Sequence, residues 1–168
     1  MGVCWMLTTQ DGRNDGSRRK YLEEPSRFRA PDQQLFDKLC QIRNVDEVER
    51  AQLIPEAIFW KDEVPRSTSE RETWFAKMRS HLAKTEIVFF DPDNGLEVKS
   101  KPWTAKASPK HLYRRELSQV LACGQSVIIY QHFRREQRDE FISRMKRELQ
   151  DKKACPFVFA LRTSHVGK

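Results

Sequence analysis

The 168-residue sequence contains no long hydrophobic run, and this absence excludes a membrane-spanning helix. Even the apolar stretch at residues 126–130 holds only three aliphatic side chains. The first twelve residues, MGVCWMLTTQDG, lack both the basic flank and the apolar stretch of a signal peptide. The sequence therefore predicts a protein that neither enters a membrane nor is secreted.

Clustered cysteines are also missing. The four cysteines lie far apart, inside apolar segments, at Cys4, Cys40, Cys123 and Cys155. No Cys-x-x-Cys motif or His/Cys cluster is present, so the sequence predicts neither a zinc site nor a disulfide framework, and no dedicated metal site. A reducing cytoplasm is the expected location.

What the chain does have is charge, with a basic excess. It carries 31 Lys and Arg against 24 Asp and Glu, a net charge of +7, and 33% of its residues are charged. An average domain has about 25%. Ten Phe and four Trp are spread along the chain, which favours a globular fold over disorder. The length predicts a single domain over residues 1–168.

The basic excess is concentrated between residues 99 and 115, which contain no acidic residue. This stretch holds six cations and an interleaved tryptophan: Lys99, Lys101, Trp103, Lys106, Lys110, Arg114 and Arg115. Cations that neutralise phosphates, beside flat rings that stack on bases, are typical of a DNA- or RNA-binding surface. A solvated loop that keeps the protein soluble explains the composition equally well.

Apolar patterning predicts an alternation of strands and helices. The expected strands cover residues 3–8, 57–60, 86–90, 126–130 and 156–161, and the expected helices cover residues 32–43, 45–52, 67–82, 109–122 and 137–149. The third helix has the Ser-x-x-Glu spacing of a capping box at Ser67 and Glu70. The inner strands are short continuous apolar runs, which predicts an α/β three-layer sandwich: a mostly parallel sheet of about five strands with helices on both faces.

Ligands of open parallel sheets bind beyond the carboxyl ends of the strands, and three polar segments are expected there. The first, residues 8–16, contains Asp11, Gly12, Asp15 and Gly16. Its glycines allow a close approach to a ligand, and its carboxylates can accept hydrogen bonds from a ribose or an amine. It contains neither a G-x-G-x-x-G fingerprint nor a phosphate-binding loop, so an ordinary turn explains it as well.

The second segment is the sharpest signal, because an apolar strand runs directly into Asp91-Pro92-Asp93-Asn94. Asp91 can accept a proton or a hydrogen bond from an amine, or bind a metal ion together with Asp93 and Glu97. The alternative is a plain turn rich in Asp, Pro, Asn and Gly. Two acids at the carboxyl edge of a sheet, beside a basic stretch, favour the functional interpretation.

The third segment places Tyr130, His132 and Phe133 after another buried strand. His132 is a candidate base or ligand, although a single histidine is more often structural. Tyr130 and Phe133 are candidates to stack on a flat substrate.

At these three segments the chain resembles a known family. GVCWMLTTQDGRNDG, IVFFDPDNGLEVKS and SVIIYQHFRRE are similar to an uncharacterised bacterial and phage-borne family. That family resembles class I S-adenosylmethionine-dependent methyltransferases, notably the large-subunit rRNA adenine methyltransferase and the three-Cys-motif partner proteins. The resemblance implies a Rossmann-like fold, with S-adenosylmethionine bound at Asp11, Gly12, Asp15 and Gly16. It also implies that Asp91-Pro92 opens the catalytic D-P-P-Y motif, which holds the target amine while an aromatic ring stacks on the flipped base.

The chain departs from this pattern in two ways. Asp93 and Asn94 replace the second proline and the aromatic residue, so base stacking has to come from Tyr130 or Phe133. The upstream segment that completes the cofactor pocket in relatives is missing. By this resemblance, we expect the chain to be a member of the family that is truncated at its N-terminus or divergent.

Three functions follow from these observations. The leading hypothesis is a methyltransferase-like domain that acts on or binds nucleic acid through Asp91 and the basic stretch. The second is a Mg²⁺-dependent nuclease, because Asp91, Glu97 and Lys99 have the residue types of a D…E-x-K site. The third is a non-catalytic nucleic-acid-binding protein. Saturable binding of S-adenosylmethionine, Mg²⁺-dependent cleavage, and salt-sensitive binding alone distinguish the three.

Overall fold

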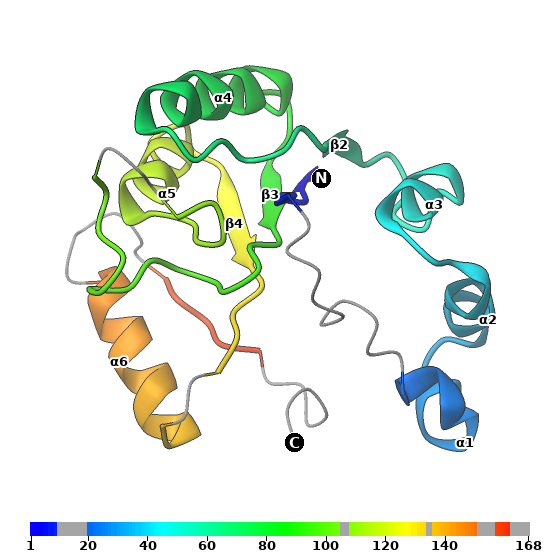
Figure 1. Cartoon of the computed structure of the whole chain (residues 1–168). Helices are drawn as coiled ribbons and strands as arrows, with labels where there is room; N and C mark the ends of the chain where they lie inside the picture. Colours follow the sequence, from blue (N-terminus) through cyan, green and yellow to red (C-terminus); the bar gives the residue numbers. More distant parts are fainter. Residues whose placement is uncertain (10–19, 105–107, 134–135, 151–156, 162–168) are drawn as a thin grey trace.

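The computed structural model describes residues 1–9, 20–104, 108–133, 136–150 and 157–161. The chain alternates strands and helices as expected (Figure 1). The strands are β1 (Gly2–Cys4), β2 (Ile58–Trp60), β3 (Ile87–Phe90) and β4 (Ser126–Ile129). The helices are the 3-10 turn η2 (Lys20–Glu23), α1 (Pro25–Phe28), α2 (Gln33–Gln41), α3 (Val45–Arg50), α4 (Thr68–His81), α5 (Arg114–Leu121) and α6 (Arg138–Gln150).

The strands form one sheet in the order β2-β1-β3-β4, and every neighbouring pair is parallel. This confirms the α/β class and the parallel sheet. Because the chain passes from β1 outward to β2 on one side and to β3 on the other, the strand order reverses between β1 and β3. Such a switch point is where open α/β sheets bind their ligands, at the carboxyl ends of the two strands.

The sheet has four strands in the described residues rather than about five. Residues 157–161, the described part of the strand predicted over residues 156–161, pair with no other described strand. Phe157, Phe159 and Leu161 are 77%, 82% and 90% exposed. This short apolar run has the composition of a strand, but without ladder hydrogen bonds to another described strand and without a packed face it does not join the sheet.

One face of the sheet carries the hydrophobic core. Cys4, Val88 and Phe90 point to this face and are almost completely buried against α4 and α5. The predicted apolar stripe of α4 is confirmed, since the side chains at positions 74, 75, 78 and 82 are all buried. Figure 1 shows α4 and α5 close to the sheet and α6 further down, with Met145 and Leu149 of α6 packed on the same core.

The opposite face is covered mainly towards β2. Trp5 stacks on Phe59 and meets Phe89 edge to face, and its indole Nε1 donates to Glu49 of α3. Helices α1 to α3 lie beyond this side of the sheet (Figure 1). At the β3–β4 end, Ile87 and Ile128 are 38% and 45% exposed.

The starts of α2, α3 and α4 agree with the sequence to within a residue, whereas the start of α5 does not. Asp32 and Asn44 cap α2 and α3 by accepting from the backbone amides three residues later. Ser67 precedes α4, but it makes no capping hydrogen bond and its hydroxyl contacts Ser69 instead, so the predicted capping box is wrong.

The helix expected from residue 109 begins at Arg114. Residues 109–110 form a turn instead, and Leu112 forms a β-bridge with Leu96, so this segment pairs with the loop after β3. The Asn94 amide donates to the Lys110 carbonyl at 2.9 Å, and the Leu112 amide donates to the Gly95 carbonyl at 3.0 Å. Within the described part of the chain, no helix has the length and apolar character to span a membrane.

Candidate functional site

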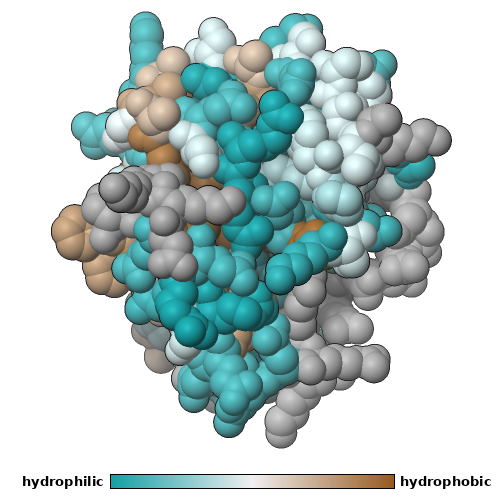
Figure 2. All heavy atoms as spheres, turned by 90° about the vertical axis from the view of Figure 1, so that its left-hand side faces the viewer, coloured by the Kyte–Doolittle hydropathy of each residue, from teal (hydrophilic) through white to brown (hydrophobic). Residues whose placement is uncertain are grey.

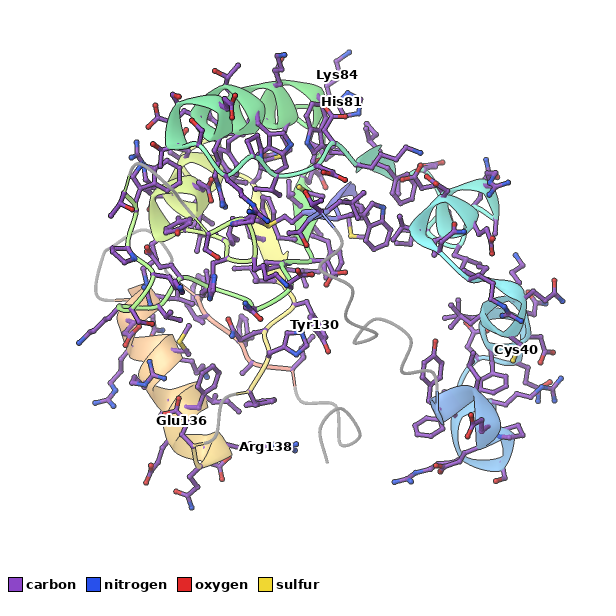
Figure 3. All side chains as sticks on the ribbon, in the orientation of Figure 1. Cys40, His81, Lys84, Tyr130, Glu136 and Arg138 are labelled. Carbon is purple, nitrogen blue, oxygen red and sulfur yellow. The ribbon has the colours of Figure 1, made fainter. Side chains whose placement is uncertain are left out.

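The carboxyl ends of β1, β3 and β4 bring polar side chains together at the switch point. The Asp91 amide donates to the Cys4 carbonyl, which continues the β1–β3 ladder to the end of β1. Thr8, after β1, donates through Oγ1 to Asp93 Oδ2 at 2.8 Å. Tyr130 follows β4, with its amide bonded to the Phe90 carbonyl. Figure 3 shows Tyr130 below the sheet, far from Lys84 and His81 at the other end.

Asp91 has the electrostatics of a functional carboxyl group. Burial at the sheet edge, together with the negative charge of Asp93, raises its pKa from 3.8 to about 6. The pKa of Tyr130 is raised by burial and by the charge of Asp91, which places these two groups within electrostatic reach of each other. A carboxyl that titrates near neutral pH at the carboxyl edge of a sheet can accept a proton or hold an amine.

Gln131 joins the second and third predicted segments. Its side-chain oxygen accepts from the Leu96 amide at 2.8 Å, and its nitrogen donates to the carbonyls of Asn94 and His132. Gly95 makes this packing possible: its φ is +84°, and a Cβ there would lie 2.3 Å from the Gln131 amide. The motifs of the sequence do not single out Gln131, although its place one residue beyond Tyr130 is a usable signal.

The two aromatic rings of the third segment, Tyr130 and Phe133, have different neighbours. His132 is exposed and meets Tyr130 edge to face at 4.9 Å between ring centroids. Phe133 packs on Phe141 of α6 and lies under the Arg138 guanidinium. Tyr130 is therefore the ring at the switch point, whereas Phe133 belongs to the α6 contact.

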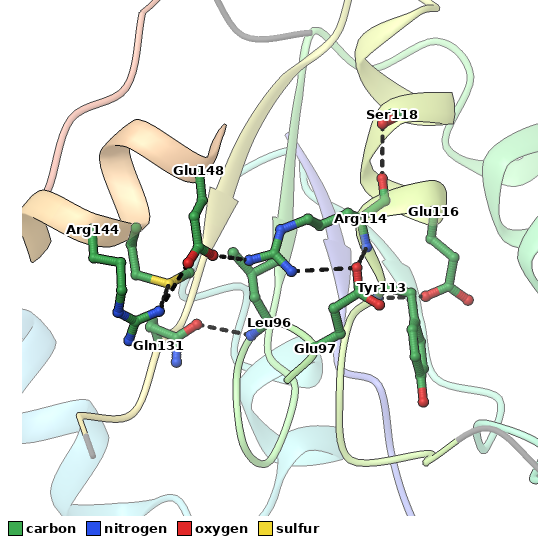
Figure 4. Close-up of polar contacts among 10 residues, drawn as sticks. Leu96, Glu97, Tyr113, Arg114, Glu116, Ser118, Gln131, Arg144 and Glu148 are labelled. Carbon is green, nitrogen blue, oxygen red and sulfur yellow. Dashed lines mark hydrogen bonds and ion pairs between the residues drawn. The ribbon is translucent and has the colours of Figure 1, made fainter. Parts of the chain in front are cut away.

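The basic stretch divides into paired and unpaired cations. Arg114 bonds Glu97 and Glu148, and Arg144 of α6 shares Glu148 (Figure 4). Arg115 pairs with Glu72 and stacks over Trp103, and Lys110 lies 3.6 Å from Asp93. In the part of the chain that the structure describes, Lys99 and Lys101 are the exposed cations of this stretch without an acidic partner. The face carrying α5 and α6 is mostly hydrophilic (Figure 2).

A buried ion pair between α4 and α5 fixes the segment that leads into α5, residues 108–113. Arg71 of α4, 0% exposed, binds Glu116 through two bonds of 2.7 and 2.8 Å. The same guanidinium donates to the carbonyls of Ser108 and His111 at 2.7 and 2.6 Å. Arg71 therefore holds residues 108–113 in place. No sequence pattern indicates this role, since arginine on an amphipathic helix is normally solvated.

The described residues form no cluster of metal ligands. Among the described residues no group of three or more His, Cys, Asp and Glu side chains is placed to hold a metal ion. Glu97, a proposed nuclease ligand, accepts from the Arg114 amide at 3.0 Å and pairs with its guanidinium. The proposed cofactor residues Asp11, Gly12, Asp15 and Gly16, and the proposed phosphate ligand Lys106, lie outside the described residues.

Comparison with known proteins adds no relative: no family model, no curated protein and no solved structure matches the chain. A function for the chain therefore has to be argued from its fold and from the geometry of the switch point.

Proposed function

We propose that the chain is a methyltransferase-like domain that binds nucleic acid and holds an amino group of a base at Asp91. The observation that carries this proposal is the position of Asp91. It is a carboxyl group with a pKa of about 6, at the β1–β3 switch point of a parallel sheet, where α/β domains bind their ligands.

The groups around the switch point suit S-adenosylmethionine. This cofactor carries an ammonium and a sulfonium group, and the Asp93 carboxylate beside Asp91 can stabilise such a cation. The Thr8 hydroxyl and the Tyr130 phenol add donors and acceptors at the same edge. The loop that follows Thr8 contains Asp11, Gly12, Asp15 and Gly16, which we assign to the cofactor. When bound, the cofactor supplies an electrophilic methyl group.

The chain's own residues would act on the amine. The carboxyl group of Asp91 accepts a hydrogen bond from it, and Pro92, which is buried, fixes the turn that presents the carboxyl. Tyr130 lies beside Asp91 and provides a ring on which a base can stack. Asp93, Asn94 and His132 line the same edge and are assigned to orienting the substrate.

Lys99 and Lys101 are assigned to the phosphates, because they are exposed and unpaired in the described structure. Their replacement by glutamine should weaken binding of a short single-stranded oligonucleotide and reduce the salt slope by about 0.7 for each phosphate that is no longer neutralised. The matched control is K146Q/R147Q on α6, which removes the same charge and should change the affinity little. Equal losses in both double variants would show that only net charge matters.

Transfer of labelled methyl groups from S-adenosylmethionine to nucleic acid tests the chemistry. The wild-type chain is expected to transfer them, and Asp91→Asn should lose the activity while the exposed control Asp62→Asn keeps it. Asparagine retains the size of the side chain but cannot accept a proton. Cleavage of the nucleic acid in Mg²⁺, abolished by Glu97→Ala, would overturn the proposal in favour of a nuclease.

A further inference from the structure

A polar cavity lies away from the switch point, between the segment before α4 and the loop after residue 98. Its volume is about 400 Å³. Two cations, three hydroxyl groups and two prolines line it: Arg66, Lys101, Ser100, Thr104, Ser108, Pro102 and Pro109. In Figure 1 the start of α4 and this loop lie on the left of the molecule, above α6. No acidic side chain of the described residues lines the cavity.

Among the described residues, no partner compensates the charges in this cavity. Neither the Arg66 guanidinium nor the Lys101 ammonium forms an ion pair or a hydrogen bond within the described part of the chain. Two like charges facing one cavity repel each other, and a bound anion removes that repulsion.

One side of the cavity, at Ser108, is held in place by hydrogen bonds. The Ser108 carbonyl accepts from buried Arg71, and the Ser108 amide donates to the Tyr113 hydroxyl at 2.9 Å. The Ser108 hydroxyl contacts His111 Nδ1 at 3.0 Å. Pro102 and Pro109 restrict the backbone on both sides. A preorganised wall lowers the entropic cost of binding a ligand.

We propose that this cavity is a phosphate-binding site that holds one phosphate group of a nucleic-acid strand. Arg66 supplies a planar fork of donors, Lys101 a point charge and the hydroxyls neutral donors, a set that matches the oxygens of a phosphate. Arg66 lies outside the basic stretch recognised in the sequence, so the site joins two distant segments. The inference rests on the proposed function only for the source of the phosphate.

Calorimetric titration of the full chain with inorganic pyrophosphate, and separately with a short single-stranded oligonucleotide, tests the site. In the double variant Arg66→Gln/Lys101→Gln, the Kd for pyrophosphate should rise at least about tenfold, because two charge-assisted hydrogen bonds are removed. The oligonucleotide should also bind more weakly. The matched control Arg50→Gln/Lys84→Gln removes the same charge from exposed positions elsewhere and should leave both affinities unchanged.

The two probes separate two kinds of failure. If pyrophosphate does not bind, or binds equally well to the double variant, the phosphate site is refuted even where the oligonucleotide binds. In the other case, pyrophosphate binds to the wild-type chain and not to the double variant, but the oligonucleotide does not bind at all. This result would confirm a site for a small phosphate-bearing ligand and would refute the proposed function. Circular dichroism of each variant verifies that it is folded.

Discussion

The buried Arg71–Glu116 pair should contribute strongly to the stability of the fold. Arg71→Met removes the guanidinium but retains most of the aliphatic bulk, and it leaves the Glu116 carboxylate 2% exposed, with the Tyr113 amide still donating to it. Two backbone carbonyls, of Ser108 and His111, lose their donors as well. Breaking a buried pair in this way costs about 3–5 kcal/mol.

For a chain of this size, about 1 kcal/mol corresponds to a shift of the Tm by about 2–4 °C. Arg71→Met should therefore lower the Tm by about 6–20 °C. Chemical denaturation in urea measures the same loss as a lower midpoint with an unchanged slope. Most of the loss in stability comes from the buried Glu116 carboxylate that no longer has a cationic partner. Removing this carboxylate as well, in Arg71→Met/Glu116→Leu, should recover a large part of the stability.

A surface control is available in the Arg115–Glu72 pair, which joins the same two helices but is about half exposed. Arg115→Met should cost about 1 kcal/mol or less. A cost for Arg71→Met below about 1 kcal/mol, the range of a surface pair, would refute the reasoning. So would a double variant as unstable as the sum of the two single variants.

Three further predictions concern the site and the core. Asp91→Asn should stabilise the fold by up to about 3 kcal/mol at pH 8 and by little at pH 4. The pKa of Asp91 is raised in the folded protein, so the stability of the wild-type chain falls as the pH rises from 3.8 to about 6. Urea unfolding at both pH values measures this difference, and destabilisation at pH 8 would contradict it. Gly95→Ala should lower the free energy of unfolding more than Gly124→Ala. Both glycines have positive φ, but only at Gly95 would the added Cβ clash with a neighbour, Gln131. Equal losses in the two variants would count against the packing described. Thiol labelling of the native protein should modify exposed Cys123 rapidly and leave Cys4, whose pKa burial raises to about 12, unmodified; fast labelling of Cys4 would contradict its burial.

Much of the fold could be predicted because it depends on local patterns. Continuous apolar runs predicted parallel strands, and the spacing of Trp74, Met78 and Leu82 predicted the buried stripe of α4. Arg71 lies on the same face of α4, but the spacing of apolar residues does not predict that an arginine is buried there. Its burial depends on Glu116, which is 45 residues further along the chain. The start of α5, and the absence of a fifth strand from the described sheet, depend likewise on pairing between distant segments.

The candidate site was predictable to a similar degree. The rule that ligands bind at the carboxyl ends of parallel strands brings Asp91 and Tyr130 together from the sequence alone. The pairing of the basic residues was not predictable, because Arg114 and Arg115 find their acids on α6 and α4. The sequence contains six cations in this stretch, whereas the fold leaves Lys99 and Lys101 exposed and unpaired among the described residues.

Calorimetric titration of the full chain with S-adenosylmethionine tests the central claim most directly. The account predicts saturable binding at one site, lost in Asp11→Asn/Asp15→Asn and retained in Asp46→Asn/Asp62→Asn, which removes the same charge from exposed positions. Absence of saturable heat in the folded wild-type chain would contradict the claim that this is a methyltransferase-like domain, and so would equal binding by both double variants.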